Sequence, residues 1–146
     1  MNETNAKQPS SSSVQVHVGG CQCGAVRFEA RLDLREGATR CNCSVCTKRG
    51  SIGVNVKPSA FRILSGKEWV GEYRVEGSLN ARCFCTRCGV QLHGYGHVPE
   101  IGGDFVSVNI ACLDDVDLAE VPVLHWDGRH DNWAAGPRSA PWPVRA

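Results

Sequence analysis

Nine cysteines in a chain of 146 residues constrain the fold more than any other feature, because most of them stand in tight groups. They are Cys21, Cys23, Cys41, Cys43, Cys46, Cys83, Cys85, Cys88 and Cys112. Cys-x-Cys and Cys-x-x-Cys spacings bring thiolates onto one tight turn and suit a shared metal ion, whereas disulfide scaffolds disperse their cysteines. The odd number, and a polar start from Met1 to Ser13 without the features of a secretory signal, also oppose disulfides. The pattern therefore predicts a metal-binding protein.

Donor sets made only of thiolates are typical of zinc or of an iron–sulfur cluster. Zinc takes four ligands in a structural site and leaves one position open in a catalytic site. The group Cys41, Cys43 and Cys46 forms an open set of three. Two pairs, the second in a zinc-knuckle sequence, form a closed set of four: Cys21, Cys23, Cys85 and Cys88.

A metal shared by the closed set would link distant parts of the chain, because residues 24–84 separate Cys23 from Cys85. Closing so long a loop makes metal binding a large contribution to folding. At the open set, zinc with three thiolates keeps one negative charge, so a fourth thiolate needs compensation nearby. Lys48 and Arg49 are the nearest downstream cations and could meet a substrate carboxylate, although a solvated turn is the default interpretation. Gly50 and Ser51 could offer backbone N–H groups to a peptide-like substrate or could form the turn into the next strand.

Alternating apolar residues predict a mainly β fold, since no long helical periodicity is present. We expect one helical turn over Ser44–Arg49 with Ser44 as N-cap, a loop over 31–39, and an edge strand after Pro122. The expected strands cover 14–18, 26–30, 52–56, 61–64, 69–75, 79–83, 90–92, 106–110 and 121–126. The expected organisation is a disordered tail (1–13), one zinc domain (14–133) and a Pro-rich C-terminal tail (134–146).

The charges nearly balance, with 16 Lys and Arg against 15 Asp and Glu. Such a chain has no electrostatic reason to bind nucleic acid or an anionic membrane. No apolar run approaches the roughly 20 residues of a membrane span. We therefore expect a cytoplasmic protein without nucleic-acid or membrane partners, and the sequence leaves its oligomeric state open.

The remaining candidates have ordinary structural interpretations. Cys83 and Cys112 are expected to be buried core thiols. His93 and His97 are expected to be satisfied histidines, with a proton carrier or a fourth ligand of the open set as the alternative. His125 receives the same structural interpretation by default.

Three motifs in this order resemble the glutathione-dependent formaldehyde-activating enzyme family, also called the centromere protein V family. They are Gly20-Cys21-Gln22-Cys23-Gly24, Cys41-Asn42-Cys43-Ser44-Val45-Cys46 and Phe84-Cys85-Thr86-Arg87-Cys88-Gly89. The resemblance runs from about Val18 to Trp133 and includes Leu113-Asp114-Asp115 and the stretch from His125-Trp126 to Trp133.

The resemblance implies a β-tent of antiparallel sheets around a structural zinc, as in zinc-binding chaperones of Rab GTPases, with few short helical turns. It also implies two zinc ions per chain, a structural one on the closed set and a catalytic one on the open set. The implied chemistry is that of a carbon–sulfur lyase that joins a thiol such as glutathione to formaldehyde.

Two other hypotheses belong to different classes. Both zinc ions could be structural, in a non-catalytic binding module for a protein or chromatin. A chromatin binder should carry a basic extension, yet the N-terminal segment holds only Lys7 and Glu3 as charged side chains. A zinc-dependent chaperone of a GTPase follows only from analogy of fold.

Overall fold

The structure is a computed structural model that describes residues 13–145. Within that range the chain forms ten strands and one short α-helix, α2 (Ser44–Arg49). The strands are β1 (Gln15–Gly20), β2 (Arg27–Leu32), β3 (Ala38–Cys41), β4 (Gly53–Val56), β5 (Phe61–Ser65), β6 (Val70–Arg74), β7 (Ala81–Cys85), β8 (Gln91–Val98), β9 (Gly103–Asn109) and β10 (Val123–Trp126). Short 3-10 turns are η2 (Leu34–Glu36), η3 (Pro58–Ala60), η4 (Lys67–Trp69), η5 (Pro99–Ile101), η6 (Ile110–Cys112), η7 (Leu118–Glu120) and η8 (Trp133–Ala135). The tail expected at 1–13 lies outside the described residues except for Ser13.

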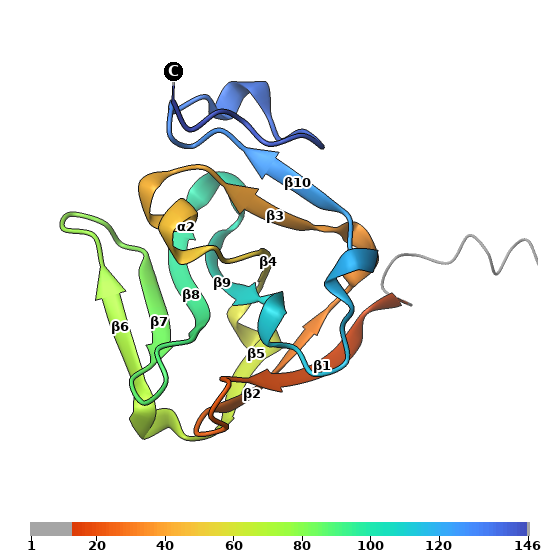
Figure 1. Cartoon of the computed structure of the whole chain (residues 1–146), viewed down its shortest axis with the longest axis vertical. Helices are drawn as coiled ribbons and strands as arrows, with labels where there is room; N and C mark the ends of the chain where they lie inside the picture. The colour runs from red at the N-terminus through yellow and green to blue at the C-terminus, as the bar shows by residue number, and fades with distance from the viewer. Residues whose placement is uncertain (1–12, 146) are drawn as a thin grey trace, which may run out of the picture.

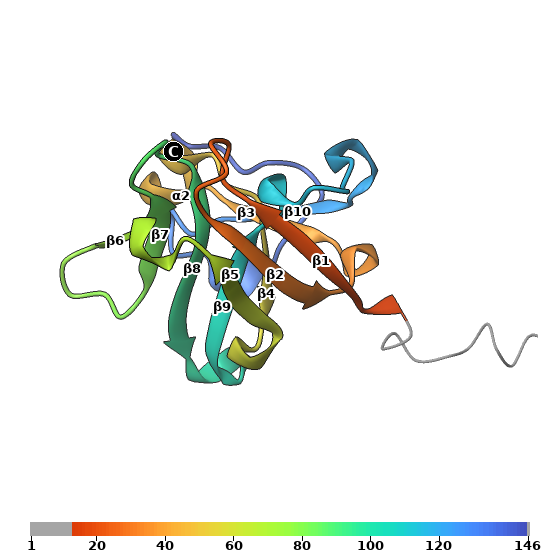
Figure 2. The same cartoon turned by 90° about the horizontal axis from the view of Figure 1, so that it is seen from below.

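The strands form two sheets, which confirms the mainly β prediction. The small sheet has the order β1-β2-β5, and the large sheet has the order β10-β3-β4-β9-β8-β7-β6. Figure 1 shows the large sheet curving from β10 to β6, and Figure 2, seen from below, shows the small sheet in front of it. All pairs are antiparallel except β3 with β10, which is parallel. The long chain between these two strands permits parallel pairing, which a short hairpin does not.

The core lies where the two sheets face each other. Its largest fully buried side chains include Phe28 from β2, Leu92 from β8 and Val108 from β9. Phe28 also packs against Phe61 of β5, with ring centroids 5.2 Å apart. The period-two alternation seen in the sequence is therefore the alternation of core-facing and outward-facing positions.

Two local predictions differ from the structure. Residues 31–39 are not one loop, because β2 continues to Leu32 and β3 begins at Ala38. The N-cap of α2 is Cys43 rather than Ser44, since the Cys43 side chain accepts from the backbone N–H of Cys46. A sulfur atom thus takes the place of the usual hydroxyl or carboxylate oxygen at this cap.

The segment after β10 folds back along the edge of the large sheet, as Figure 1 shows near the C-terminus. His125 and Arg138 form an antiparallel bridge, and Trp142 Nε1 donates to the His125 carbonyl at 2.8 Å. This contact covers part of the outer edge of β10, which was expected from Pro122 to be an edge strand.

The domain limits of 14–133 stay a prediction. Over residues 13–145, no helix is long and apolar enough to cross a membrane.

We expect Phe28→Ala to lower the free energy of unfolding by about 3–5 kcal/mol, because a large fully buried side chain leaves a cavity at the junction of the sheets. Leu79→Ala is the control, since Leu79 is 70% exposed, and it should change stability by no more than about 0.5 kcal/mol. Denaturant unfolding of both variants measures the difference. Equal losses in the two variants would contradict this description of the core.

Candidate functional site

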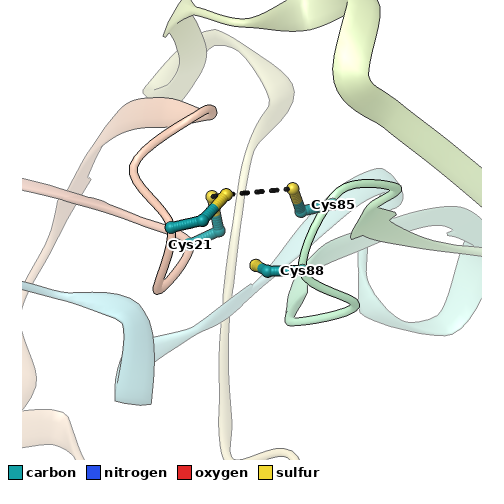
Figure 3. Close-up of side chains that lie close together, drawn as sticks. Cys21, Cys85 and Cys88 are labelled. Carbon is teal, nitrogen blue, oxygen red and sulfur yellow. Dashed lines mark hydrogen bonds between the residues drawn. The ribbon is translucent and has the colours of Figure 1, made fainter.

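The first cysteine group gathers four sulfur atoms from two distant parts of the chain. Cys21 and Cys23 lie on the turn between β1 and β2, whereas Cys85 ends β7 and Cys88 lies in the loop to β8. The four sulfurs lie within 4.8 Å of one another. Figure 3 shows the side chains of Cys21, Cys85 and Cys88 converging from the two loops. The Sγ–Sγ distances are 3.6 Å from Cys21 to Cys23 and 3.9 Å from Cys23 to Cys85.

These distances fit a tetrahedral zinc site. Four sulfurs around zinc, with bonds of about 2.3 Å, stand about 3.8 Å apart. Backbone N–H groups also point at the sulfurs, with Val26 donating to Cys21 and Arg87 to Cys85, each at 3.3 Å. Hydrogen bonds from backbone N–H groups lower the pKa of the Cys88 thiol to about 6. Such bonds favour the thiolate form, which is the form that binds metal.

The second cysteine group is local in sequence. Cys41 ends β3, Cys43 caps α2 and Cys46 lies in the first turn of that helix. Their sulfurs also lie within 4.8 Å of one another. The Cys46 N–H donates to Cys43 Sγ at 3.4 Å, so the helix start itself holds two of the three cysteines together.

Three sulfurs this close favour a single negative charge. Hydrogen bonds from the thiols of Cys41 and Cys46 lower the pKa of Cys43 to about 2. The pKa of Cys46 is raised instead, because its thiol lies beside those of Cys41 and Cys43. Each further thiolate needs a positive charge beside it, because like charges oppose one another's ionisation. A soft divalent cation supplies that charge, so the group could bind zinc and would leave one coordination position for another donor.

A hydrogen-bond network around the buried Asp127 carboxylate holds the loop between Cys41 and Cys43. The Asn42 side-chain amide donates to Asp127 Oδ1 at 2.7 Å, and its oxygen accepts from the Arg129 N–H at 2.9 Å. His130 Nδ1 lies 2.7 Å from the same Asp127 oxygen. Burial opposes ionisation of Asp127, but the bonds from Asn42, His130 and another amide outweigh it and lower its pKa. The sequence alone holds no signal for Asp127, since a single aspartate gives no sign of such a role.

A small cavity opens beside the second cysteine group, and we call it the thiolate cavity. It has a volume of about 160 Å³ and is lined by Cys41 and Cys46 together with Arg49, Arg82 and His93. The amides of Asn55, Asn80 and Asn109 complete most of its polar wall. Its described lining includes no carboxylate, so the cavity suits a ligand that carries negative charge.

A second, larger hollow of about 570 Å³ shares Arg49 and Arg82 with the thiolate cavity and adds Lys48. We call it the cation groove (Ser44, Val45, Lys48, Arg49, Tyr73, Arg82, Phe84, Gly89 and Gln91). Arg49 Nε donates to Gln91 Oε1 at 2.6 Å, which fixes the guanidinium at the boundary between the two spaces. Arg82 comes from β7, far from Lys48 in sequence, and the sequence alone gave no signal for it.

Of the other candidate residues, Ser51 joins this arrangement, and the rest lie elsewhere or have other partners. The Gly50 N–H donates to the Cys46 carbonyl at 3.0 Å and closes the helix. This N–H is therefore not available to a substrate, and Gly50 forms the turn after the helix instead. Ser51 does line the thiolate cavity. His125 lies with Cys41 in a different hollow of about 390 Å³ walled by the C-terminal segment. His97 instead faces Asp104 at the surface, 2.6 Å away.

Cys83 and Cys112 are both buried, as predicted from the sequence. Burial raises the pKa of each thiol to about 11. Cys112 Sγ donates to the Gln91 carbonyl at 3.1 Å. Neither cysteine belongs to the two sulfur groups found among residues 13–145.

We expect Cys85→Ala to destabilise the fold much more than Cys43→Ala. Cys85 belongs to the group that joins two distant loops, so its metal-binding energy would be folding energy. Cys43 belongs to a local group whose loss opens no long loop. Thermal melting of both variants, purified with zinc, checks this expectation. Equal shifts in Tm would contradict the division between a structural and an open group.

We expect Asp127→Asn to lower Tm at pH 7 and to lower the metal affinity of the second cysteine group. The folded-state pKa of Asp127 is depressed, so the stabilisation by its carboxylate is present above the unfolded pKa of about 3.9 and is lost as pH falls through the folded value. The difference in Tm from the wild type should therefore shrink toward low pH. Asp104→Asn, in an exposed His–Asp pair, is the control, and an equal effect there would contradict the role of Asp127.

Comparisons with known proteins agree with this geometry. The sequence model of the family described as glutathione-dependent formaldehyde-activating enzyme matches residues 16–127. A protein of Halomonas elongata named "Putative glutathione-dependent formaldehyde-activating enzyme" is 34% identical in an alignment of 98 residues, and the match covers 61% of this chain. The match spans 62% of that relative, which is less than two thirds of its length.

A crystal structure of a Rhodobacter sphaeroides protein has the same fold, with a TM-score of 0.63 and 33% identity. That similarity covers 73% of this chain and 98% of the other. The family match includes both cysteine groups and ends at Asp127, and it covers well over half of the sequence. The chain therefore belongs to the glutathione-dependent formaldehyde-activating enzyme family.

Proposed function

We propose that the protein is a carbon–sulfur lyase-type zinc enzyme that joins a thiol to a small aldehyde, or releases the aldehyde from the adduct. The observation that carries the proposal is the open group of three sulfurs in the wall of a cavity with two guanidinium groups. Glutathione is the thiol named in the family's description, and formaldehyde is the aldehyde. Both substrates are part of the proposal.

We infer two zinc ions per chain. Cys21, Cys23, Cys85 and Cys88 would hold the structural ion, and Cys41, Cys43 and Cys46 would hold the other. When bound at the open group, zinc supplies Lewis-acid chemistry, which favours the thiolate form of a thiol and polarises a carbonyl oxygen. The remaining contributions come from side chains of this chain.

The cations of the site favour a thiol that carries carboxylates. Arg49 and Arg82 line both the thiolate cavity and the cation groove, and Lys48 lines the groove. A carboxylate-bearing thiol can place its sulfur beside Cys41 and Cys46 while its carboxylates meet these cations. The same charges offset the negative charge of a fourth thiolate near the three cysteines.

The reaction itself needs few groups. The thiolate sulfur forms a bond to the carbonyl carbon, and the π electrons of the C=O bond move to oxygen. The resulting alkoxide takes a proton from water, while the thiol proton has already gone to solvent. The product is a hydroxymethyl thioether, and the reverse sequence releases the aldehyde. The cavity contributes by holding both reactants at one place.

Titration of cobalt-substituted protein with glutathione and with 2-mercaptoethanol tests thiol binding. Both thiols should change the thiolate-to-metal absorbance, because the open group leaves a position for another donor. Arg82→Ala should weaken glutathione binding by up to about fivefold, with a smaller effect for the neutral thiol and at high salt. Arg62→Ala is the control, since Arg62 pairs with Glu29 outside both spaces.

If no thiol perturbs the spectrum, the second group is a closed site, and the binding-module hypothesis gains. If thiols bind without selectivity in the Arg82 variant, the role of the cation is wrong while thiol binding stands. Product formation from glutathione and formaldehyde, measured against the uncatalysed rate and against Cys43→Ala, tests the reaction.

A further inference from the structure

His93 occupies an unusual position in the thiolate cavity. It lies on β8, between β7 and β9 in the large sheet, and is only 8% exposed. Its ring packs against Phe61 with centroids 4.5 Å apart. It lines the same cavity as Cys41 and Cys46. A polar ring is thus held rigidly in the wall of the candidate site.

The ring nitrogen Nδ1 of His93 is buried and has no hydrogen-bond partner. In His17, His97 and His130, by contrast, Nδ1 lies 3.3, 2.6 and 2.7 Å from a carboxylate oxygen. A carboxylate at Nδ1 would favour a protonated ring. Because His93 lacks one, its position favours the neutral imidazole.

The missing partner also indicates where the single proton of the neutral ring sits. A buried main-chain N–H without an acceptor is rarer in proteins than a main-chain carbonyl without a donor, and the same preference applied to the ring leaves Nδ1 without the proton. The proton then belongs on Nε2, where a ligand in the cavity that His93 lines can accept it. Burial lowers the pKa of His93 to about 4, and Arg49 acts in the same direction against the opposing charge of Glu72.

We propose that His93 donates a hydrogen bond from Nε2–H to the carbonyl oxygen of the aldehyde and to the alkoxide that forms from it. This inference rests on the proposed function. In the addition, the sulfur forms the C–S bond, the π pair moves to oxygen, and water supplies the proton. His93 keeps its own proton throughout, so it stabilises developing charge and does not act as an acid.

A set of His93 variants tests the proposal by rate. His93→Leu should lower kcat by about 10²–10³-fold, the usual loss for one oxyanion donor. His93→Gln places an amide N–H near the position of Nε2–H and should recover most of that loss. His93→Phe keeps the packing on Phe61 if the leucine variant folds poorly. His97→Leu, on the same strand but outside the thiolate cavity, should leave kcat unchanged.

Measurements without turnover separate this inference from the proposed function. Nitrogen-15 NMR should find His93 neutral and protonated on Nε2 from pH 5.5 to 8. Sodium formate is the probe, and its carboxylate oxygen stands in for the oxygen of the aldehyde. Formate should shift the Nε2–H signal of the wild type, and its affinity for His93→Leu should be lower by a factor of about ten or more. The cobalt absorbance of His93→Leu should match the wild type, because the proposal does not make His93 a ligand.

Several results would overturn the proposal: a cationic ring at pH 6.5, a proton on Nδ1, formate binding that does not depend on His93, or an altered cobalt spectrum. If kcat fell as pH rose through a His93 pKa near neutrality, His93 would act as a general acid instead. If the wild type adds no thiol to formaldehyde but the NMR and formate results hold, the proposed reaction fails and the donor in the cavity stands.

Discussion

The meeting of the β1–β2 turn with the β7–β8 loop is the contact on which the rest of the structure depends. Four sulfurs from these loops lie within 4.8 Å of one another, and residues 24–84 form the loop between the two pairs. The cost of closing a loop grows slowly with its length, so one bound ion can hold a large part of the domain. The loop that carries Cys88 leads into β8, the strand of His93, and none of the four sulfurs of this group lines the thiolate cavity.

The second sulfur group depends on different forces. Its three cysteines are close in sequence, and α2 needs only one capping sulfur to hold two of them together. Three thiolates repel one another, so the loop needs support that does not come from the sulfurs. Asp127 supplies it through Asn42. A buried carboxylate is costly unless it is fully hydrogen-bonded, and this one accepts bonds from several groups that converge on the cysteine loop.

Charge complementarity links the cysteines to the cavity beside them. Arg49 and Arg82 offset the negative charge of the sulfur group and leave the space suited to an anionic ligand. Burial and the Arg49 guanidinium make a positive charge on His93 unfavourable, which agrees with a neutral ring in the wall. A neutral imidazole can still stabilise an oxyanion, because a fixed N–H dipole in a protein-lined cavity interacts more strongly with developing charge than it would in water.

The sequence by itself determined the features that depend on short spacings. The division of the cysteines into four and three follows from Cys-x-Cys and Cys-x-x-Cys spacings, and the core strands follow from period-two alternation, as at Phe28 and Val108. Only the tertiary structure decided the features that depend on partners far along the chain. β3 has little apolar alternation and is a strand because β4 and β10 flank it. Arg82, Asp127 and His93 gain their roles from neighbours that folding brings to them, and a sequence holds no local record of which distant side chain will fill a hydrogen bond or share a cavity.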